Sequence, residues 1–406
     1  MITNLVASAQ VAFTKHLHQA GVPAGARVVG GLLGRGGFLI ASLYTGIAAA
    51  GLATARELAR TASAAALSWP PLAGTGTDLG SKVRVLAAGA RSRWVDLDGP
   101  VHYLDFGGPA SGPTIVCVHG LAGAAVNWSA IAPLLVNRCR VLALDLPGHG
   151  LTQSLGRDTK IPALRDVLHR FIEAVAGEPV MLAGNSMGGM LSLLEASAAP
   201  TAVAGLVLVD PVLPLVPALP DRFVTAMLAA YAVPGLGPLL MRQRRRMAPE
   251  ELVASVLSLC CVDVSRVPAD VLAQHAAVAR QTLMSPETER EISTTARSII
   301  ATAGALRGGA YRQAVSSITC PVLLLHGTHD RLVPIAVARA AARANPGWTL
   351  IEIPGTGHAP QLEAPADTAS AVTGWLDAAG GGSVRGDEPV PVLLDGHHLA
   401  ENPKPA

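Results

Sequence analysis

The chain has few aromatic residues, little charge and only five cysteines. Phe, Trp and Tyr make up 3% of its 406 residues, which argues against a stacking platform for single-stranded nucleic acid. Charged residues make up 15%, the formal net charge is +2, and only four basic residues are lysines, so no large basic face for nucleic acid is indicated. Because half of the residues are hydrophobic, an extended disordered chain is excluded.

The cysteines do not form a pattern that indicates disulfides or a zinc site. They are odd in number and include no C-x-x-C pair. Two of them fall inside or beside apolar runs that are typical of buried strands. We therefore expect reduced thiols in the core, and no metal, at all five positions: Cys117, Cys139, Cys260, Cys261 and Cys320.

The first 90 residues differ in composition from the rest of the chain. They contain seven basic and two acidic groups, and the stretch 36–55 has no charge. At 1.5 Å per residue this stretch is long enough to cross about 30 Å of hydrocarbon. It begins too far from Met1, without a basic leading region, to be an ordinary secretory signal. Two interpretations stay open: a buried helical hairpin on the main domain, or a membrane segment held by Arg56 and Arg60.

From residue 93 onward, short apolar runs alternate with helical patterns. Residues 93–107 predict a β-hairpin that turns at Asp98 and Gly99. Continuously apolar strands that alternate with helices form parallel sheets covered on both faces, with the chemistry at the carboxyl ends of the strands. The runs that predict such strands are 114–120, 140–150, 179–186, 203–211, 321–330 and 349–358.

One interval interrupts this alternation and predicts a lid. It has several helical stretches, divided by prolines, and no strand signal. Four arginines within it, at 242 and 244–246, indicate a solvated helix face or a contact with an anionic substrate or lipid head group. The last residues begin with three glycines and are rich in Pro and charge, which is typical of a mobile tail. The expected organisation is an N-terminal extension 1–90, a core 91–212 and 319–379, a lid 213–318 and a tail 380–406.

A serine follows one of the apolar runs in the sequence Gly184-Asn185-Ser186-Met187-Gly188, which matches G-x-S-x-G. The pattern alone is weakly specific, because 42 residues of the chain are glycine. Here it lies between a predicted strand and a predicted helix, which is the context that the pattern requires. Such a turn presents the serine hydroxyl above the sheet, while Gly184 and Gly188 leave room where strand and helix crowd together.

A serine hydroxyl needs a base, and the base needs an orienting carboxylate. Asp330 ends the run 321–330, and His358 lies in a glycine-rich loop after the next strand. Asp210 also ends a run and is the alternative carboxylate. When a serine attacks a carbonyl group, the carbonyl oxygen becomes negatively charged. This oxyanion needs two backbone N–H donors, each contributing about 3 to 4 kcal/mol of transition-state stabilisation. Met187, after the nucleophile, and Leu121, after the third predicted strand, are the candidates.

These motifs resemble the lid-bearing branch of the α/β-hydrolase superfamily. The resemblance covers residues 93–379 and rests on five ordered motifs: HGLAG, DLPGHG, GNSMGG, HGTHDRLVP and GTGHAPQLEAP. The order Ser, Asp, His along the chain is also that of the family. The stretch RLVP after Asp330 favours this residue over Asp210. The implied catalytic residues are Ser186, Asp330 and His358, and the implied oxyanion donors are Leu121 and Met187.

The resemblance implies an α/β fold with a mostly parallel eight-stranded sheet, helices on both faces and a helical lid, preceded here by an N-terminal helical extension. Asp145 and His149 belong to a turn that the family uses structurally. His119 is expected to be structural, because the adjoining oxyanion donor is a backbone group. Asn127 and Trp128 either line the pocket or pack beneath the oxyanion loop.

We expect a carboxylesterase or lipase-like serine hydrolase that acts on a hydrophobic acyl ester, without a metal or organic cofactor. It is expected to be cytoplasmic, with membrane association through residues 1–90 as an open option. Hydrolases of carbon–carbon bonds in ring-cleavage products share GNSMGG, but this chain lacks their Gly-Pro-Gly oxyanion loop and the Trp after the histidine. Acyl transfer to another acceptor would use the same site. A non-catalytic, membrane-associated binding protein is the alternative from another class, and the complete triad speaks against it.

Overall fold

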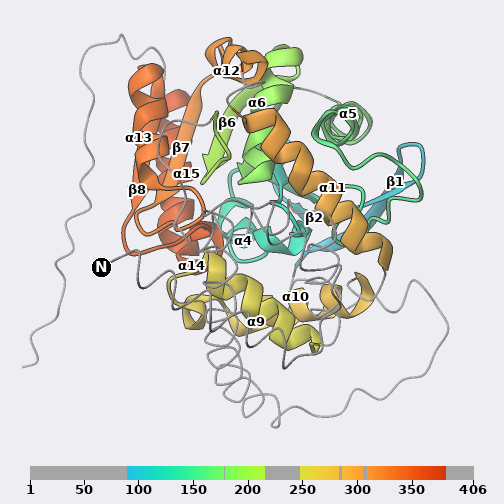
Figure 1. Ribbon diagram of the computed structural model, residues 1–406. Helices are drawn as coiled ribbons and strands as arrows, with labels where there is room; N and C mark the ends of the chain where they lie inside the picture. The colour runs from blue at the N-terminus through green and yellow to red at the C-terminus, as the bar shows by residue number, and fades with distance from the viewer. Residues whose placement is uncertain (1–88, 178, 215–246, 283–285, 305–308, 381–406) are drawn as a thin grey trace, which may run out of the picture.

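The computed structural model describes residues 89–177, 179–214, 247–282, 286–304 and 309–380. Within these ranges, eight strands form one sheet in the order β1-β2-β4-β3-β5-β6-β7-β8 (Figure 1). β2 pairs antiparallel with β1 and β4, and all other neighbours are parallel, so the predicted sheet and hairpin are confirmed. The strands are β1 Arg91–Asp96, β2 Pro100–Gly107, β3 Thr114–Val118, β4 Arg140–Leu144, β5 Val180–Asn185, β6 Val203–Val209, β7 Val322–Gly327 and β8 Trp348–Ile353.

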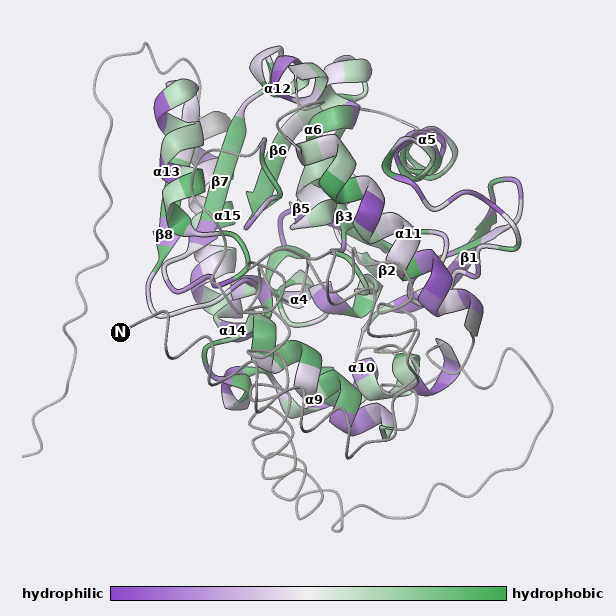
Figure 2. Cartoon of the chain, in the orientation of Figure 1, coloured by the Kyte–Doolittle hydropathy of each residue, from purple (hydrophilic) through white to green (hydrophobic). Residues whose placement is uncertain are grey.

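Both faces of the sheet are apolar. Side chains alternate between the two faces along each strand, and hydrophobic residues occupy both sets of positions. In β3, Val116 and Val118 belong to one buried cluster, whereas Ile115 and Cys117 belong to the cluster on the other face. This two-sided burial explains why the parallel strands are continuously hydrophobic in sequence, as the green strands of Figure 2 show. All five cysteines are free, and Cys117, Cys139 and Cys261 are buried, as predicted.

Helices cover both faces of the sheet. Side chains of α5, α6, α12 and α13 belong to the first cluster, and those of η1, α4 and α15 belong to the second. The bounds are η1 Ala125–Trp128, α4 Ala132–Leu135, α5 Ile161–Phe171, η2 Ile172–Ala176, α6 Met187–Ala198, α9 Pro249–Cys260, η3 Val264–Arg266, α10 Ala269–Thr282, α11 Pro286–Ala303, α12 Gly309–Ser316, α13 Ile335–Ala344, α14 Pro360–Glu363 and α15 Pro365–Gly380.

The helices between β6 and β7 do not all pack in the same place. Leu257 of α9 and Val271 of α10 pack with Ala359 and Leu362, which follow β8, and thus lie at the carboxyl end of the sheet. In contrast, α12 packs on α6, where the Tyr311 hydroxyl donates a hydrogen bond to Val212 O (2.5 Å). The interval predicted as a lid therefore contributes to the sheet face as well as to the strand ends.

No helix in the described ranges is both long and apolar enough to cross a membrane. The stretch 36–55, the arginines at 242 and 244–246 and residues 381–406 of the predicted tail lie outside the described residues. The membrane interpretation of residues 1–90 therefore stays a prediction.

Candidate active site

Ser186 lies in a strained turn between β5 and α6. Its φ of 55° and ψ of −114° place a residue with a side chain in a region that L-residues rarely adopt. The turn leaves no room for other side chains nearby. A Cβ on Gly188 would lie 2.1 Å from Val118 O, and one on Gly184 would lie 2.4 Å from the Gly188 carbonyl. The strand, turn and helix predicted around G-x-S-x-G are therefore present, with glycine where the backbones cross.

The loop after β3 lies against the serine. A Cβ on Gly120 would be 3.3 Å from Ser186 Cβ, and Gly123 N donates to Gly120 O (3.1 Å) to close a turn around Leu121. Met187 is the first residue of α6, so its N–H lacks an intrahelical acceptor and lies at the positive end of the helix dipole. The two backbone segments predicted as oxyanion donors thus both border Ser186.

His358 is held by Asp330 through a buried hydrogen bond between His358 Nδ1 and Asp330 Oδ2 (2.7 Å). The other carboxylate oxygen of Asp330 accepts hydrogen bonds from Leu332 N (2.7 Å) and Val333 N (3.0 Å). Burial alone would raise the pKa of Asp330, but the attraction of His358 and these hydrogen bonds lower it below its usual value. Because a carboxylate only accepts, His358 carries its proton on Nδ1 and keeps the lone pair of Nε2 for a proton transfer.

Asn185 connects the serine turn with the loop between β8 and α14, residues 354–359, which carries His358 and which we call the histidine loop. Its Nδ2 donates to Val209 O (3.0 Å) and to His358 O (3.1 Å). These bonds bring the ends of β5 and β6 and the loop after β8 together, with Ser186 as the next residue. No role was predicted for Asn185. The available signal was a polar residue at the last position of a strand that is buried throughout.

Glu363 anchors the same loop from α14. Its side chain is fully buried and accepts hydrogen bonds from Gly357 N (2.8 Å) and Asp263 N (2.8 Å). Next to it, His358 N donates to Cys260 O at the end of α9 (2.5 Å). The histidine loop is therefore joined to the segment inserted between β6 and β7. Glu363 was not predicted either, although it lies in the motif GTGHAPQLEAP.

A family model described as "Alpha/beta hydrolase family" matches residues 115–371, which contain each of these groups. The chain belongs to the alpha/beta hydrolase family. It is 28% identical over 275 residues to the pimeloyl-[acyl-carrier protein] methyl ester esterase of Aromatoleum aromaticum, covering 63% of this chain and 95% of that protein. It is also 28% identical over 282 residues to the dihydrolipoyllysine-residue acetyltransferase component of the acetoin cleaving system of Cupriavidus necator, covering 68% of this chain and 66% of that protein.

Solved structures share the fold of this alpha/beta hydrolase. A membrane phospholipase A matches with a TM-score of 0.55 and 23% identity, over 84% of this chain and 98% of the other. A thermophilic esterase from Thermogutta terrifontis matches with a TM-score of 0.54 and 23% identity, over 71% of this chain and 99% of the other. The predicted α/β-hydrolase fold is thus confirmed.

His119 of this alpha/beta hydrolase has both ring nitrogens engaged within the protein. Nδ1 donates to Gly120 O (2.7 Å), and Nε2 accepts from Leu146 N (3.1 Å). Burial lowers the pKa of His119. These contacts agree with the predicted structural role, because neither nitrogen is left to accept a proton from a substrate.

Asp145 joins the turn after β4 to η1 and β2. Its carboxylate accepts hydrogen bonds from Ala125 N (2.6 Å), Leu151 N (2.9 Å) and His102 Nδ1 (2.7 Å). Burial opposes its ionisation, but the hydrogen bond and charge of His102 and the backbone bond keep the pKa of Asp145 below its usual value. In the same turn, burial lowers the pKa of His149 to about 3. These observations agree with the structural role predicted for both residues.

Asn127 and Trp128 follow the predicted oxyanion loop, residues 119–123, and pack beneath it. Asn127 Oδ1 accepts a hydrogen bond from Ala124 N (2.8 Å), and Trp128 is only 2% exposed within the second cluster. Of the two interpretations left open for them, packing beneath the loop agrees with these contacts.

Asp210 follows β6, next to Asp330, but it is not the carboxylate that faces His358 Nδ1. Its Oδ1 accepts a hydrogen bond from Gly327 N (2.9 Å) instead. The choice of Asp330 over Asp210 as partner of the histidine therefore agrees with the geometry.

Proposed function

We propose that this member of the family is a serine esterase that works through Ser186, His358 and Asp330. The observation that supports it most is the hydrogen bond between Asp330 Oδ2 and His358 Nδ1 (2.7 Å), which leaves Nε2 available as a base on a residue whose carbonyl oxygen is bonded by Asn185, the neighbour of Ser186. Relatives named as esterases support the reaction class.

The reaction takes place in two acyl transfers. Ser186 Oγ attacks the acyl carbonyl carbon while its proton passes to His358 Nε2, and Asp330 stabilises the resulting imidazolium. The N–H groups of Leu121 and Met187 stabilise the oxyanion. When the tetrahedral intermediate collapses, the bond to the alcohol breaks and the alcohol takes the proton from His358. Water then attacks the acyl-enzyme in the same way and releases the acid. None of these steps requires a metal or an organic cofactor.

The substrate we propose is a small carboxylic ester with a hydrophobic acyl group. Leu257 and Val271, from the inserted helices, pack with apolar residues of the histidine loop, so we assign α9 and α10 the role of a lid. Such a cover excludes water, and the exclusion of water strengthens the interactions that stabilise the oxyanion. The Aromatoleum relative is named for a methyl ester, which supports an ester whose alcohol part is small.

The test combines a covalent probe with a series of substrates. A fluorophosphonate should modify Ser186, as judged by peptide mass spectrometry, and Ser186→Ala should lower turnover of p-nitrophenyl esters by about a millionfold. Ser197→Ala, in the helix α6 that follows Ser186, is the matched control, because the Ser197 hydroxyl bonds Ser317 on the surface. Residual activity of Ser186→Ala within tenfold of the parent would remove Ser186 from its role. Turnover of a vinylogous diketone in place of the esters would instead favour carbon–carbon bond hydrolysis.

A further inference from the structure

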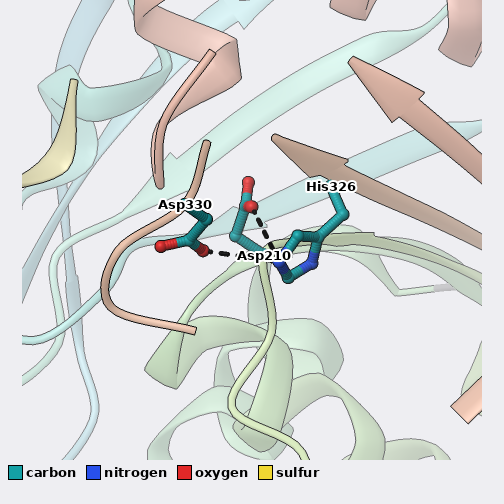
Figure 3. A group of neighbouring side chains, drawn as sticks. All are labelled: Asp210, His326 and Asp330. Carbon is teal, nitrogen blue, oxygen red and sulfur yellow. Dashed lines mark ion pairs between the residues drawn. The ribbon is translucent and has the colours of Figure 1, made fainter. Parts of the chain in front are cut away.

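The carboxyl groups of Asp210 and Asp330 lie close together, and Asp330 bonds the proposed base His358. Asp210 follows β6 and Asp330 follows β7, and His326 of β7 lies beside both (Figure 3). His326 Nε2 is 3.5 Å from Asp210 Oδ1 and 3.5 Å from Asp330 Oδ2. The side chains of all three residues are fully buried, and one polar atom of each lies within 4.8 Å of the others. Such a group is either a cation site or a set of side chains that share protons.

The state of His326 excludes a cation site of these three residues. Its Nε2 lies 2.8 Å from Val333 O, and because a carbonyl oxygen only accepts, Nε2 carries a proton. The nitrogen that faces the two carboxyl groups therefore has no lone pair for a metal. Burial outweighs the attraction of Asp330 and lowers the pKa of His326 below its usual value, so near neutral pH the ring brings little positive charge to the carboxyl groups.

Among the described residues, His326 and His358 pair with these two carboxyl groups, and His358 is neutral when it acts as a base. Glu363 and the thiol of Cys260 also act on the pair and bring no positive charge. Two neighbouring carboxyl groups in a buried site do not both ionise. Burial and the charge of Asp330 raise the pKa of Asp210 well above its usual value, whereas His358 and the backbone lower that of Asp330. The proton therefore belongs on Asp210.

One atom of Asp210 has no hydrogen-bond partner unless it carries that proton. Asp210 Oδ1 accepts from Gly327 N (2.9 Å), but Oδ2 is buried with no partner among the described residues. A buried polar atom without a partner costs about 1 to 3 kcal/mol. The two carboxyl groups are close enough for a hydrogen bond between them, so a hydroxyl on Oδ2 has an acceptor in Asp330. Asp210 is held there with a φ of 46°, a strained value for a residue with a side chain.

We propose that Asp210 is a positioning residue that stays protonated and donates its Oδ2 hydroxyl to Asp330. The bond fixes the Asp330 carboxylate against His358 and spreads its negative charge. Asp330 then stabilises a positive charge on the ring less strongly, so the acid limb of the pH profile of kcat/KM lies at lower pH than it would without this bond. This inference rests on the proposed function only in the role it gives to His358 and Asp330.

A pair of variants at this position tests the proposal. Asn at 210 keeps an acceptor for Gly327 N and a donor for Asp330, whereas Ala removes both. Asp210→Ala should lower kcat/KM by about tenfold to a hundredfold, the range for one hydrogen bond to a charged group, and move the acid limb of its pH profile to higher pH. The conservative variant Asp210→Asn should restore kcat/KM to within about threefold. An equal loss in both variants, or an acid limb that Asp210→Ala does not move, would overturn the proposal.

A second readout does not depend on activity or on the folding of Asp210→Ala. The infrared spectrum of the full chain near neutral pH should contain the carbonyl stretch of a protonated carboxylic acid that Asp210→Asn lacks. If Ser186 reacts with the fluorophosphonate and this band is absent, Asp210 is ionised and only the present inference fails. If the band is present but Ser186 does not react, only the proposed function fails.

Discussion

Ser186, Asp210 and Ala122 have positive φ angles although none of them is a glycine. Each such residue costs about 1 to 3 kcal/mol, and strained residues of this kind gather at functional sites. All three follow strands at the carboxyl end of the sheet: Ala122 after β3, Ser186 after β5 and Asp210 after β6. Of the five described non-glycine residues with positive φ, the other two, Asp98 and Leu155, lie elsewhere. The three named here lie near the proposed nucleophile, the proposed oxyanion loop and the carboxyl pair.

At the residue scale, Asn185→Asp should loosen the histidine loop. A carboxylate at this position would face two carbonyl oxygens, Val209 O and His358 O, which now accept hydrogen bonds from Nδ2. A buried, unpaired charge without donors costs about 3 kcal/mol or more. We expect a loss of that size in the free energy of unfolding, measured in urea, and a lower kcat.

Asn345→Asp is the matched control for this prediction. Asn345 Nδ2 donates to one carbonyl oxygen, Ala341 O, at the partly exposed end of α13. Water can solvate a carboxylate there, so the loss should stay below about 1 kcal/mol. Equal losses in the two variants would show that the bonds of Asn185 do not hold the loop.

The sequence predicted the residues that carry the proposed chemistry better than those that hold them. Ser186, Asp330 and His358 are polar residues just beyond apolar runs, and parallel strands bring such positions to one edge of the sheet. The roles of Asn185 and Glu363 depend on which carbonyl or amide group lies opposite each side chain. Those partners come from segments far apart in the chain, and no local pattern specifies them.

At the scale of elements, the crossing of α6 over β3 sets a strict limit on side-chain size. A Cβ on Gly188 would meet the backbone of β3, at Val118 O, 2.1 Å away. That backbone is held by β4 and β5 on its two sides and cannot move aside. Gly188→Ala should therefore lower the free energy of unfolding by about 3 kcal/mol or more, measured as a fall in Tm.

The same substitution elsewhere should have the opposite effect. Gly374 lies inside α15, and a Cβ there would meet nothing within 4 Å. Gly374→Ala should stabilise the protein by about 0.5 to 1 kcal/mol, because Gly is a poor helix former. A Tm that falls equally in both variants would contradict the importance of the crossing.

Helix positions between β6 and β7 were harder to predict than the strands. An apolar stripe on a helix indicates that one face is buried, but not which surface covers it. In α12 the buried residues are Tyr311 and Val315, and they pack on the sheet side of the molecule. α9 has the same kind of stripe and packs at the strand ends. Only the tertiary structure separates the two.

At the scale of the whole molecule, buried neutral histidines make stability depend on pH. Burial lowers the pKa of His119, His149 and His326, so the unfolded chain binds more protons than the folded chain below pH about 6.5. Their contribution is therefore complete above that pH and is lost as the pH falls. With a folded-state pKa of about 3, His149 alone should account for about 1.4 kcal/mol between pH about 7.5 and about 5.5.

His149→Gln isolates this contribution. The variant has no group that titrates at this position, so its free energy of unfolding in urea should change less between the two pH values, by about 1.4 kcal/mol. Asp210 acts in the opposite direction, because its raised pKa makes the folded chain bind the extra proton, but its effect is common to both proteins. An unchanged pH dependence would mean that His149 is charged in the folded state.

The attachment of α9 to the loop of His358 has a consequence for how a substrate enters. If α9 swings away to admit an ester, it takes with it Cys260 O, the acceptor of the His358 amide, and strains the bond between Asp263 N and Glu363. In such an open form His358, the proposed base, would be displaced from its place in the proposed triad. The proposed hydrolysis would then start only after α9 has returned, so an ester that had bound only partway would be released unreacted.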